Sequence, residues 1–201
     1  MLRKVRVVVL AGDGIGPEVI EQATRAVDAV APEAGLEITW QPELMGGCSI
    51  DAHGTALTDA VLDTCRSADA VLLGAVGGPR WDTTDPDAPR PEEGLLGLRA
   101  GLELFANLRP VKPLEALYDA SPLRRERITG TDLLVVRELT GGIYFGERGR
   151  TGDTAFDTCT YSRDEIARLA EVGFRAAAGR RGRVTSVDKA NVLESSRLWR
   201  E

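Results

Sequence analysis

Hydrophobic residues in the first third of the chain fall into continuous runs and into helical spacing. Residues 5–10 are mostly β-branched, which predicts a strand buried on both faces. Apolar positions 19, 20, 23, 27 and 30 follow at the spacing of an amphipathic helix. Residues 38–40 and 70–73 predict two more strands, with an amphipathic segment at 57–65 between them. This β-α-β-α-β order predicts an α/β fold with a largely parallel sheet and helices on both faces.

The pattern changes after Gly74. Residues 76–93 are rich in Gly, Pro and Asp and predict a long surface loop, followed by a helix over 94–104 and strands over 107–111 and 133–137. Alternating pieces over 142–160 predict a hairpin or projecting arm. Ser162 and Glu165 have the spacing of a capping box, which opens a helix that closes near Gly179. We expect a strand over 184–187 and a helix over 191–200, with the chain ending inside a domain.

Composition narrows the class of protein. The chain has 201 residues, enough for one large or two small domains, and its net charge of −6 argues against nucleic-acid binding. The basic stretch at 180–183 is explained by a solvated turn after a helix. We expect a cytoplasmic protein without a membrane partner, because no apolar run approaches the roughly 20 residues of a span. The N-terminus enters an apolar strand directly without a small-residue cleavage site, which does not favour a secretory signal. Three distant cysteines predict reduced thiols.

Lysine is rare in this chain, since only three of its 25 basic residues are lysines. One of them, Lys189, lies between an apolar run and a predicted helix. An ammonium can lose its proton where a guanidinium cannot, so Lys189 is a candidate general base. The alternative is a surface lysine left by codon bias, and lysine scarcity alone does not decide between the two.

Other candidate residues each allow two interpretations. The turn at 12–16 is glycine-rich but is not the dinucleotide fingerprint, so it predicts either a tight strand-to-helix turn or close approach to a cofactor. Arg99, Arg109 and Arg137 stand in apolar settings, which suits separate structural ion pairs or a cage for a small polyanion. Tyr144 either fills a strand pair or delivers a proton, which requires a nearby cation or metal.

Six motifs together resemble one family, the β-hydroxyacid oxidative decarboxylases of the isocitrate/isopropylmalate dehydrogenase type. They are LAGDGIGPEV (10–19), LGAVGGP (73–79), GLLGLR (94–99), LFANLRP (104–110), VRELTGGIYFG (136–146) and VDKANV (187–192). The resemblance covers essentially the whole chain. It implies NAD-dependent oxidation and decarboxylation of a malate-type substrate with Mg²⁺ or Mn²⁺.

The resemblance also implies residue roles. The three arginines would bind the substrate carboxylates, Lys189 would take the hydroxyl proton, and Tyr144 would protonate the enolate. Leu95 and Leu96 would line an isopropyl pocket, which favours 3-isopropylmalate, converted to 2-oxoisocaproate in leucine biosynthesis, over isocitrate. The residues implied near NAD are Ile15, Gly74, Val76, Gly77, Gly78, Glu92, Asn191 and Val192.

The resemblance finally implies an organisation. Residues 1–104 would be the first segment of a discontinuous domain, and residues 105–201 an incomplete second domain with a dimerisation arm at about 142–160. We expect this to be the N-terminal portion of the fold and a homodimer. The family's metal-binding aspartates would lie beyond Glu201. The alternative is a truncated, inactive remnant that only associates or binds ligand weakly.

Overall fold

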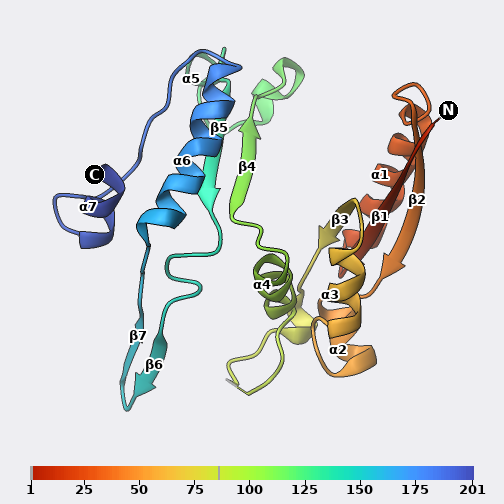
Figure 1. Cartoon of the computed structure of the whole chain (residues 1–201), viewed down its shortest axis with the longest axis horizontal. Helices are drawn as coiled ribbons and strands as arrows, with labels where there is room; N and C mark the ends of the chain where they lie inside the picture. The colour runs from red at the N-terminus through yellow and green to blue at the C-terminus, as the bar shows by residue number, and fades with distance from the viewer. Residues whose placement is uncertain (1, 86) are drawn as a thin grey trace. The chain divides into compact units, whose positions relative to one another are not determined.

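The computed structural model describes residues 2–85 and 87–201. The chain forms two compact units, Met1–Glu103 and Leu104–Glu201. Both units are built from strands with helices packed against them (Figure 1).

The first unit is built on a three-stranded parallel sheet in the order β2-β1-β3. Its strands are β1 (Arg3–Gly12), β2 (Leu36–Glu43) and β3 (Ala70–Ala75). Its helices are α1 (Gly16–Val30), α2 (Gly47–His53), α3 (Asp59–Arg66) and α4 (Pro91–Gly101), with a 3₁₀ turn, η1 (Pro79–Trp81). The predicted parallel sheet is confirmed.

Both faces of this sheet are covered. Val8 and Leu10 of β1 are fully buried, in a core that includes Val61 and Cys65 of α3 and Leu98 of α4. Successive strand residues point to opposite faces, so Val7 and Val9 face the other side, where α1 packs on β1 and β3. The β-branched run therefore forms a strand buried on both faces, as predicted.

Glycines let the ends of β1 and β3 approach closely. Gly12 has a φ of +76°, and a Cβ there would overlap the carbonyl oxygen of Ala75. A Cβ on Gly74 would overlap the carbonyl oxygen of Ala11. Side chains are excluded from both positions by backbone atoms, so the two loops that follow these strands lie side by side.

The second unit contains a two-stranded antiparallel sheet and a long helix. Strands β4 (Ala106–Val111) and β5 (Leu133–Glu138) pair with each other, and α6 (Arg163–Ala178) packs on β5 (Figure 1). The predicted arm is a hairpin of β6 (Arg148–Thr151) and β7 (Thr154–Asp157). The remaining elements are η2 (Glu115–Ala120), α5 (Arg125–Ile128) and α7 (Glu194–Arg200).

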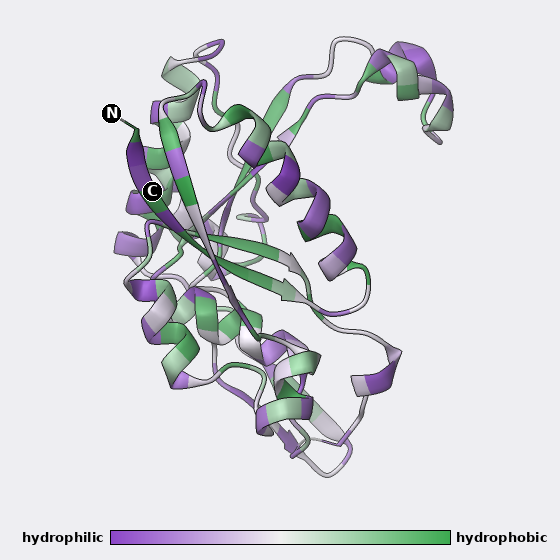
Figure 2. Ribbon diagram, turned by 90° about the vertical axis from the view of Figure 1, so that its right-hand side faces the viewer, coloured by the Kyte–Doolittle hydropathy of each residue, from purple (hydrophilic) through white to green (hydrophobic). Residues whose placement is uncertain are grey.

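Local signals predicted several of these elements well. The capping box of α6 is present, because Ser162 Oγ accepts from the Glu165 N–H and Glu165 accepts from the Ser162 N–H. In Figure 2 the helices carry both hydrophilic and hydrophobic residues, as expected of helices with one face on a sheet. None of the described helices is long and apolar enough to cross a membrane.

Two predictions for the last 20 residues are wrong. Residues 184–187 are not a strand but exposed coil, and Val187 is 92% exposed. No strand in the described part of the chain pairs with this segment, and a strand needs a hydrogen-bonded neighbour. The last helix begins at Glu194 rather than at residue 191, because the Lys189 carbonyl closes a turn by accepting from the N–H groups of Val192 and Leu193.

Candidate active site

A buried carboxylate connects the loops after β1, β2 and β3. Asp13 is 3% exposed and follows the glycine at the end of β1. Its Oδ2 accepts from the N–H groups of Gly47 (2.7 Å) and Gly77 (2.8 Å), and its Oδ1 accepts from Cys48 (2.8 Å). Three backbone donors from two distant segments thus converge on one side chain. Sequence reasoning gave Asp13 no role, although an acid between two glycines was the available signal.

The first unit gathers the predicted cofactor residues of its loops at this carboxyl edge of the sheet. Gly74 is the last residue but one of β3, and the segment 76–78 follows that strand. Gly77 has a φ of +92°, and a Cβ there would lie 2.8 Å from Glu92 Oε1. A Cβ on Gly14 would lie 4.0 Å from the Gly77 carbonyl oxygen, so the turn that contains exposed Ile15 adjoins the same loop.

A pocket of about 260 Å³ lies beside this loop. It is lined by Gly78, Pro79, Trp81, Asp82, Thr83, Arg90, Pro91 and Glu92. Within the described residues, the buried Nε of Arg90 has no hydrogen-bond partner, which leaves a cationic donor for a polar ligand. The volume is below the roughly 300–1,000 Å³ of drug-sized sites, so the pocket has room for a small chemical group only.

Helix α4 presents the predicted substrate residues along one face. Glu92, Leu95, Leu96 and Arg99 are three or four residues apart, so they share a side of the helix. The opposite side carries Gly94 and Leu98, which are buried against the body of the unit. Two half-buried leucines therefore lie between a carboxylate and a guanidinium.

The second unit brings three further predicted residues together. Arg137 pairs with Asn107 across the sheet, and Arg109 is two positions further along β4, so both arginines lie on the same face. Arg109 Nε donates to Asn107 Oδ1 at 2.6 Å. The guanidinium carbon of Arg137 lies 5.4 Å from the ring centroid of Tyr144. This cation–π contact joins a predicted carboxylate ligand to the predicted proton donor.

Lys189 lies in the turn before α7, together with exposed Asn191 and Val192. Lys189 is exposed, and the coil before it pairs with no strand of the described chain. Asp188 holds the turn by accepting from the Ala190 N–H (2.9 Å) and from Arg200 Nε (3.0 Å). These contacts lower the pKa of the Asp188 carboxyl, the backbone hydrogen bond first and Arg200 second.

A resident divalent metal does not fit the described residues by themselves. Among residues 2–85 and 87–201, no group of three or more His, Cys, Asp or Glu side chains is placed to hold a metal ion. Asp153 and Asp157 lie in the hairpin, and Asp164 lies in the first turn of α6.

Comparison with known proteins shows the family of this chain. A family model described as isocitrate/isopropylmalate dehydrogenase matches residues 6–201. The chain belongs to the isocitrate/isopropylmalate dehydrogenase family. It is 60% identical to a protein of Anaeromyxobacter dehalogenans and 53% identical to one of Bacillus subtilis, both named 3-isopropylmalate dehydrogenase. Each match covers 98% of this chain and 57% or 56% of the relative.

A solved structure of the same family gives a similar result. The chain is similar to a β-decarboxylating dehydrogenase from Thermococcus kodakarensis, with a TM-score of 0.71 and 32% identity over 98% of this chain and 52% of the other. The chain thus spans just over half the length of these members of the isocitrate/isopropylmalate dehydrogenase family. The α/β fold predicted from the sequence is confirmed.

Proposed function

We propose that this chain contributes to NAD-dependent oxidative decarboxylation of 3-isopropylmalate. The observation that carries the proposal is the 60% identity, over nearly the whole chain, to a protein of that name. Two features of the site support it. One is the Arg137–Tyr144 contact beside Arg109, and the other is the α4 face that carries Leu95 and Leu96.

The proposed reaction consists of an oxidation, a decarboxylation and a protonation, in which these groups take different parts. NAD⁺, when bound, would supply the two-electron oxidant for the substrate C2, and Lys189 would take the proton of the C2 hydroxyl. The resulting 2-keto acid loses its neighbouring carboxylate as carbon dioxide and leaves an enolate. Tyr144 returns a proton to carbon, which completes 2-oxoisocaproate. Arg109 and Arg137 orient the carboxylates so that much of the barrier is met by positioning.

In the first unit, binding of NAD would involve the glycine-containing loops after β1 and β3. Gly77 lies beside Glu92, and the pocket lined by Gly78 and Glu92 is the proposed place for the nicotinamide end, with Gly74 and Val76 in the same segment. In the second unit, we propose Asn191 and Val192, which adjoin Lys189 in the chain, as further cofactor contacts. We propose a divalent metal as well, Mg²⁺ or Mn²⁺, with ligands outside the residues described.

The leucine pair distinguishes 3-isopropylmalate from isocitrate. An apolar wall favours an aliphatic substituent, whereas the third carboxylate of isocitrate needs a polar partner and would be desolvated without one. The test compares kcat/KM for the two substrates in protein expressed from its complete reading frame. We expect a higher kcat/KM for 3-isopropylmalate than for isocitrate, and a smaller ratio between the two after Leu95→Ser. Faster turnover of isocitrate would overturn the assignment.

The second candidate is an inactive remnant, favoured by the lack of a metal ligand set in the described chain. The 201-residue chain expressed alone should not reduce NAD with 3-isopropylmalate and Mg²⁺ or Mn²⁺. Sustained, metal-dependent turnover by that chain would show that this part suffices. We also propose that the β6–β7 hairpin pairs two copies into a homodimer, which sedimentation of the complete protein would test.

A further inference from the structure

A second buried carboxylate lies behind the proposed proton donor. Glu138 is the last residue of β5, and its side chain is only 2% exposed. Along β5 the half-buried or buried positions are 134, 136 and 138, whereas 133, 135 and 137 are exposed. Since α6 packs on β5, Glu138 faces the helix and Arg137 faces the opposite side with Tyr144.

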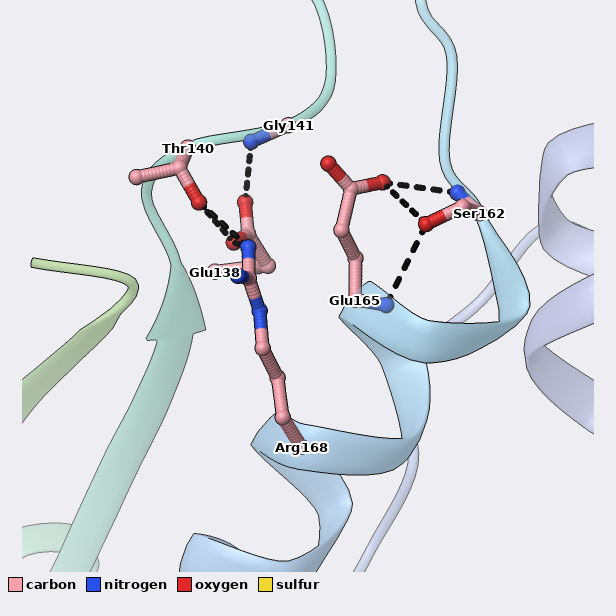
Figure 3. Close-up of polar contacts among 6 residues, drawn as sticks. All are labelled: Glu138, Thr140, Gly141, Ser162, Glu165 and Arg168. Atoms are coloured by element: carbon pink, nitrogen blue, oxygen red, sulfur yellow. Dashed lines mark hydrogen bonds and ion pairs between the residues drawn. The ribbon is translucent and has the colours of Figure 1, made fainter. Parts of the chain in front are cut away.

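Three donors converge on this carboxylate (Figure 3). Glu138 Oε1 accepts from Thr140 Oγ1 at 2.8 Å and from the Arg168 guanidinium at 3.0 Å. Glu138 Oε2 accepts from the Gly141 N–H, and Arg168 also donates to Thr140 Oγ1. The carboxylate thus ties the turn after β5 to helix α6. We call Glu138, Thr140, Gly141 and Arg168 the strand-end clamp.

Arg168 has a further contact, although its side chain is 38% exposed. Its guanidinium carbon lies 4.7 Å from the ring centroid of Phe105, the residue before β4. The clamp therefore connects α6 with both strands of the sheet. Removing Arg168 would leave the buried Glu138 carboxylate without its cation, which is costly because that carboxylate is desolvated.

Gly141 of the clamp lies three residues before Tyr144. Beyond Gly141, the Gly142 N–H donates to the Thr160 carbonyl at 2.7 Å, and the Gly142 carbonyl accepts from the Gly146 N–H at 3.2 Å. Tyr144 therefore sits at the middle of a short loop whose first residues are fixed by Glu138. Gly142 has a φ of +77°, which confines this course to glycine at that position.

We propose that Glu138 and Arg168 are positioning residues that hold Tyr144 against Arg137 for proton delivery. The inference rests on the proposed role of Tyr144. Neither residue of the pair faces the Arg137 side of the sheet, so their effect passes through the loop and through the end of β5. Loss of the clamp shifts the phenol relative to substrate, and a misplacement of about 1 Å can cost roughly 100-fold in rate.

The experiment is a double-mutant cycle in protein expressed from its complete reading frame. Tyr144→Phe, Glu138→Gln and the double variant are assayed for kcat and for KM of NAD. Glu138→Gln is expected to lower kcat about 10- to 100-fold with KM for NAD unchanged, and to add little to Tyr144→Phe. Arg175→Met is the matched control, because Arg175 pairs with Glu171 on the exposed side of the same helix.

The outcomes separate the two proposals. Suppose that Tyr144→Phe lowers kcat, and that Glu138→Gln lowers kcat by the same factor in wild type and in Tyr144→Phe. The clamp would then have only a structural role, and this result would overturn the inference but not the proposed proton donor. A fully active Glu138→Gln variant would do the same. A fully active Tyr144→Phe variant would overturn the proposed proton donor and the inference with it.

A second variant covers the case in which Glu138→Gln does not fold. Thr140→Val keeps the shape of the side chain but removes the hydroxyl shared by Glu138 and Arg168. Thr140→Val is expected to lower kcat in the wild-type background. Combined with Tyr144→Phe, it is expected to cause no further loss of kcat. Hydrogen exchange of residues 141–146 should also quicken in Thr140→Val, while the middle of α6 keeps its protection. Unchanged kcat with unchanged exchange would overturn the inference.

Discussion

Replacing Asp13 tests how much of the first unit depends on one carboxylate. Asp13 accepts three backbone N–H groups and is 3% exposed, so Asp13→Ala leaves three donors without partners in a dry site. A hydrogen bond to a charged group contributes about 1.5–3 kcal/mol net. Because the three share one acceptor they do not add fully, and we expect a loss of about 3–5 kcal/mol in the free energy of unfolding.

The isosteric variant Asp13→Asn removes the charge of the side chain but keeps its volume. Asp13→Asn keeps one oxygen, but its NH₂ group faces N–H donors where Oδ2 now accepts from Gly47 and Gly77. We expect Asp13→Asn to lose nearly as much stability as Asp13→Ala. Asp69→Ala is the control, since exposed Asp69 accepts a single backbone N–H, from Arg6, and water can replace it at a cost of about 0.5–1 kcal/mol.

Urea unfolding followed by tryptophan fluorescence measures these differences. Trp81 is a suitable reporter, because its ring packs where a Cβ on Gly47 would lie. With a slope of about 2 kcal/mol/M, a loss of 3–5 kcal/mol lowers the urea midpoint by about 1.5–2.5 M. If Asp13→Asn matched wild type, or if Asp13→Ala lost no more than Asp69→Ala, the central role assigned to this carboxylate would be wrong.

Two further predictions concern packing and burial in the same structure. Gly47→Ala should destabilise the protein by about 1–3 kcal/mol in thermal unfolding because its Cβ collides with the Trp81 ring, whereas Gly173→Ala, with open space around it inside α6, should be neutral or stabilising. Burial raises the pKa of the Cys48 and Cys65 thiols, so both should react with iodoacetamide at pH 8 more slowly in the native protein than in the urea-unfolded chain. Equal native and unfolded rates would contradict the second prediction.

The elements that the sequence predicted correctly depend on neighbours close in the chain. The β-branched run of β1, the spacing of α1 and the capping box at Ser162 are set within a few residues, and each is present in the structure. The candidate site residues in the loops after β1 and β3 lie at the same edge of the sheet, because parallel strands bring their carboxyl ends to one edge. Local rules therefore located the α/β framework and the edge where its loops meet.

What the sequence did not predict depends on partners far apart in the chain. Asp13 finds its donors 34, 35 and 64 residues away, and Glu138 finds Arg168 30 residues away. No periodicity records such a pairing. Residues 184–187 have strand-like composition, but composition cannot supply the neighbouring strand on which a ladder depends.

The contacts of Asp188 were also not predicted, and the pH dependence of thermal stability tests them. Its carboxyl pKa is lowered in the folded state, first by the Ala190 N–H and then by Arg200. A carboxyl with a lowered folded pKa stabilises the protein above its unfolded pKa of about 3.9, and that contribution is lost as the pH falls through the folded pKa. The difference in Tm between wild type and Asp188→Asn should therefore be largest at neutral pH and shrink below about pH 4.

Subtracting the variant from wild type removes the titration of other acids, including Asp132, whose carboxyl pKa is lowered chiefly by its hydrogen bond with Arg180. Asp153→Asn, in the exposed turn between β6 and β7, is the matched control and should change Tm little at either pH. Thermal unfolding of the three proteins from pH 3 to pH 7 makes the comparison. A Tm difference for Asp188→Asn that stayed constant over this range would mean that the charge of Asp188 does not stabilise the turn, and that the turn holds Lys189 by its backbone hydrogen bonds alone.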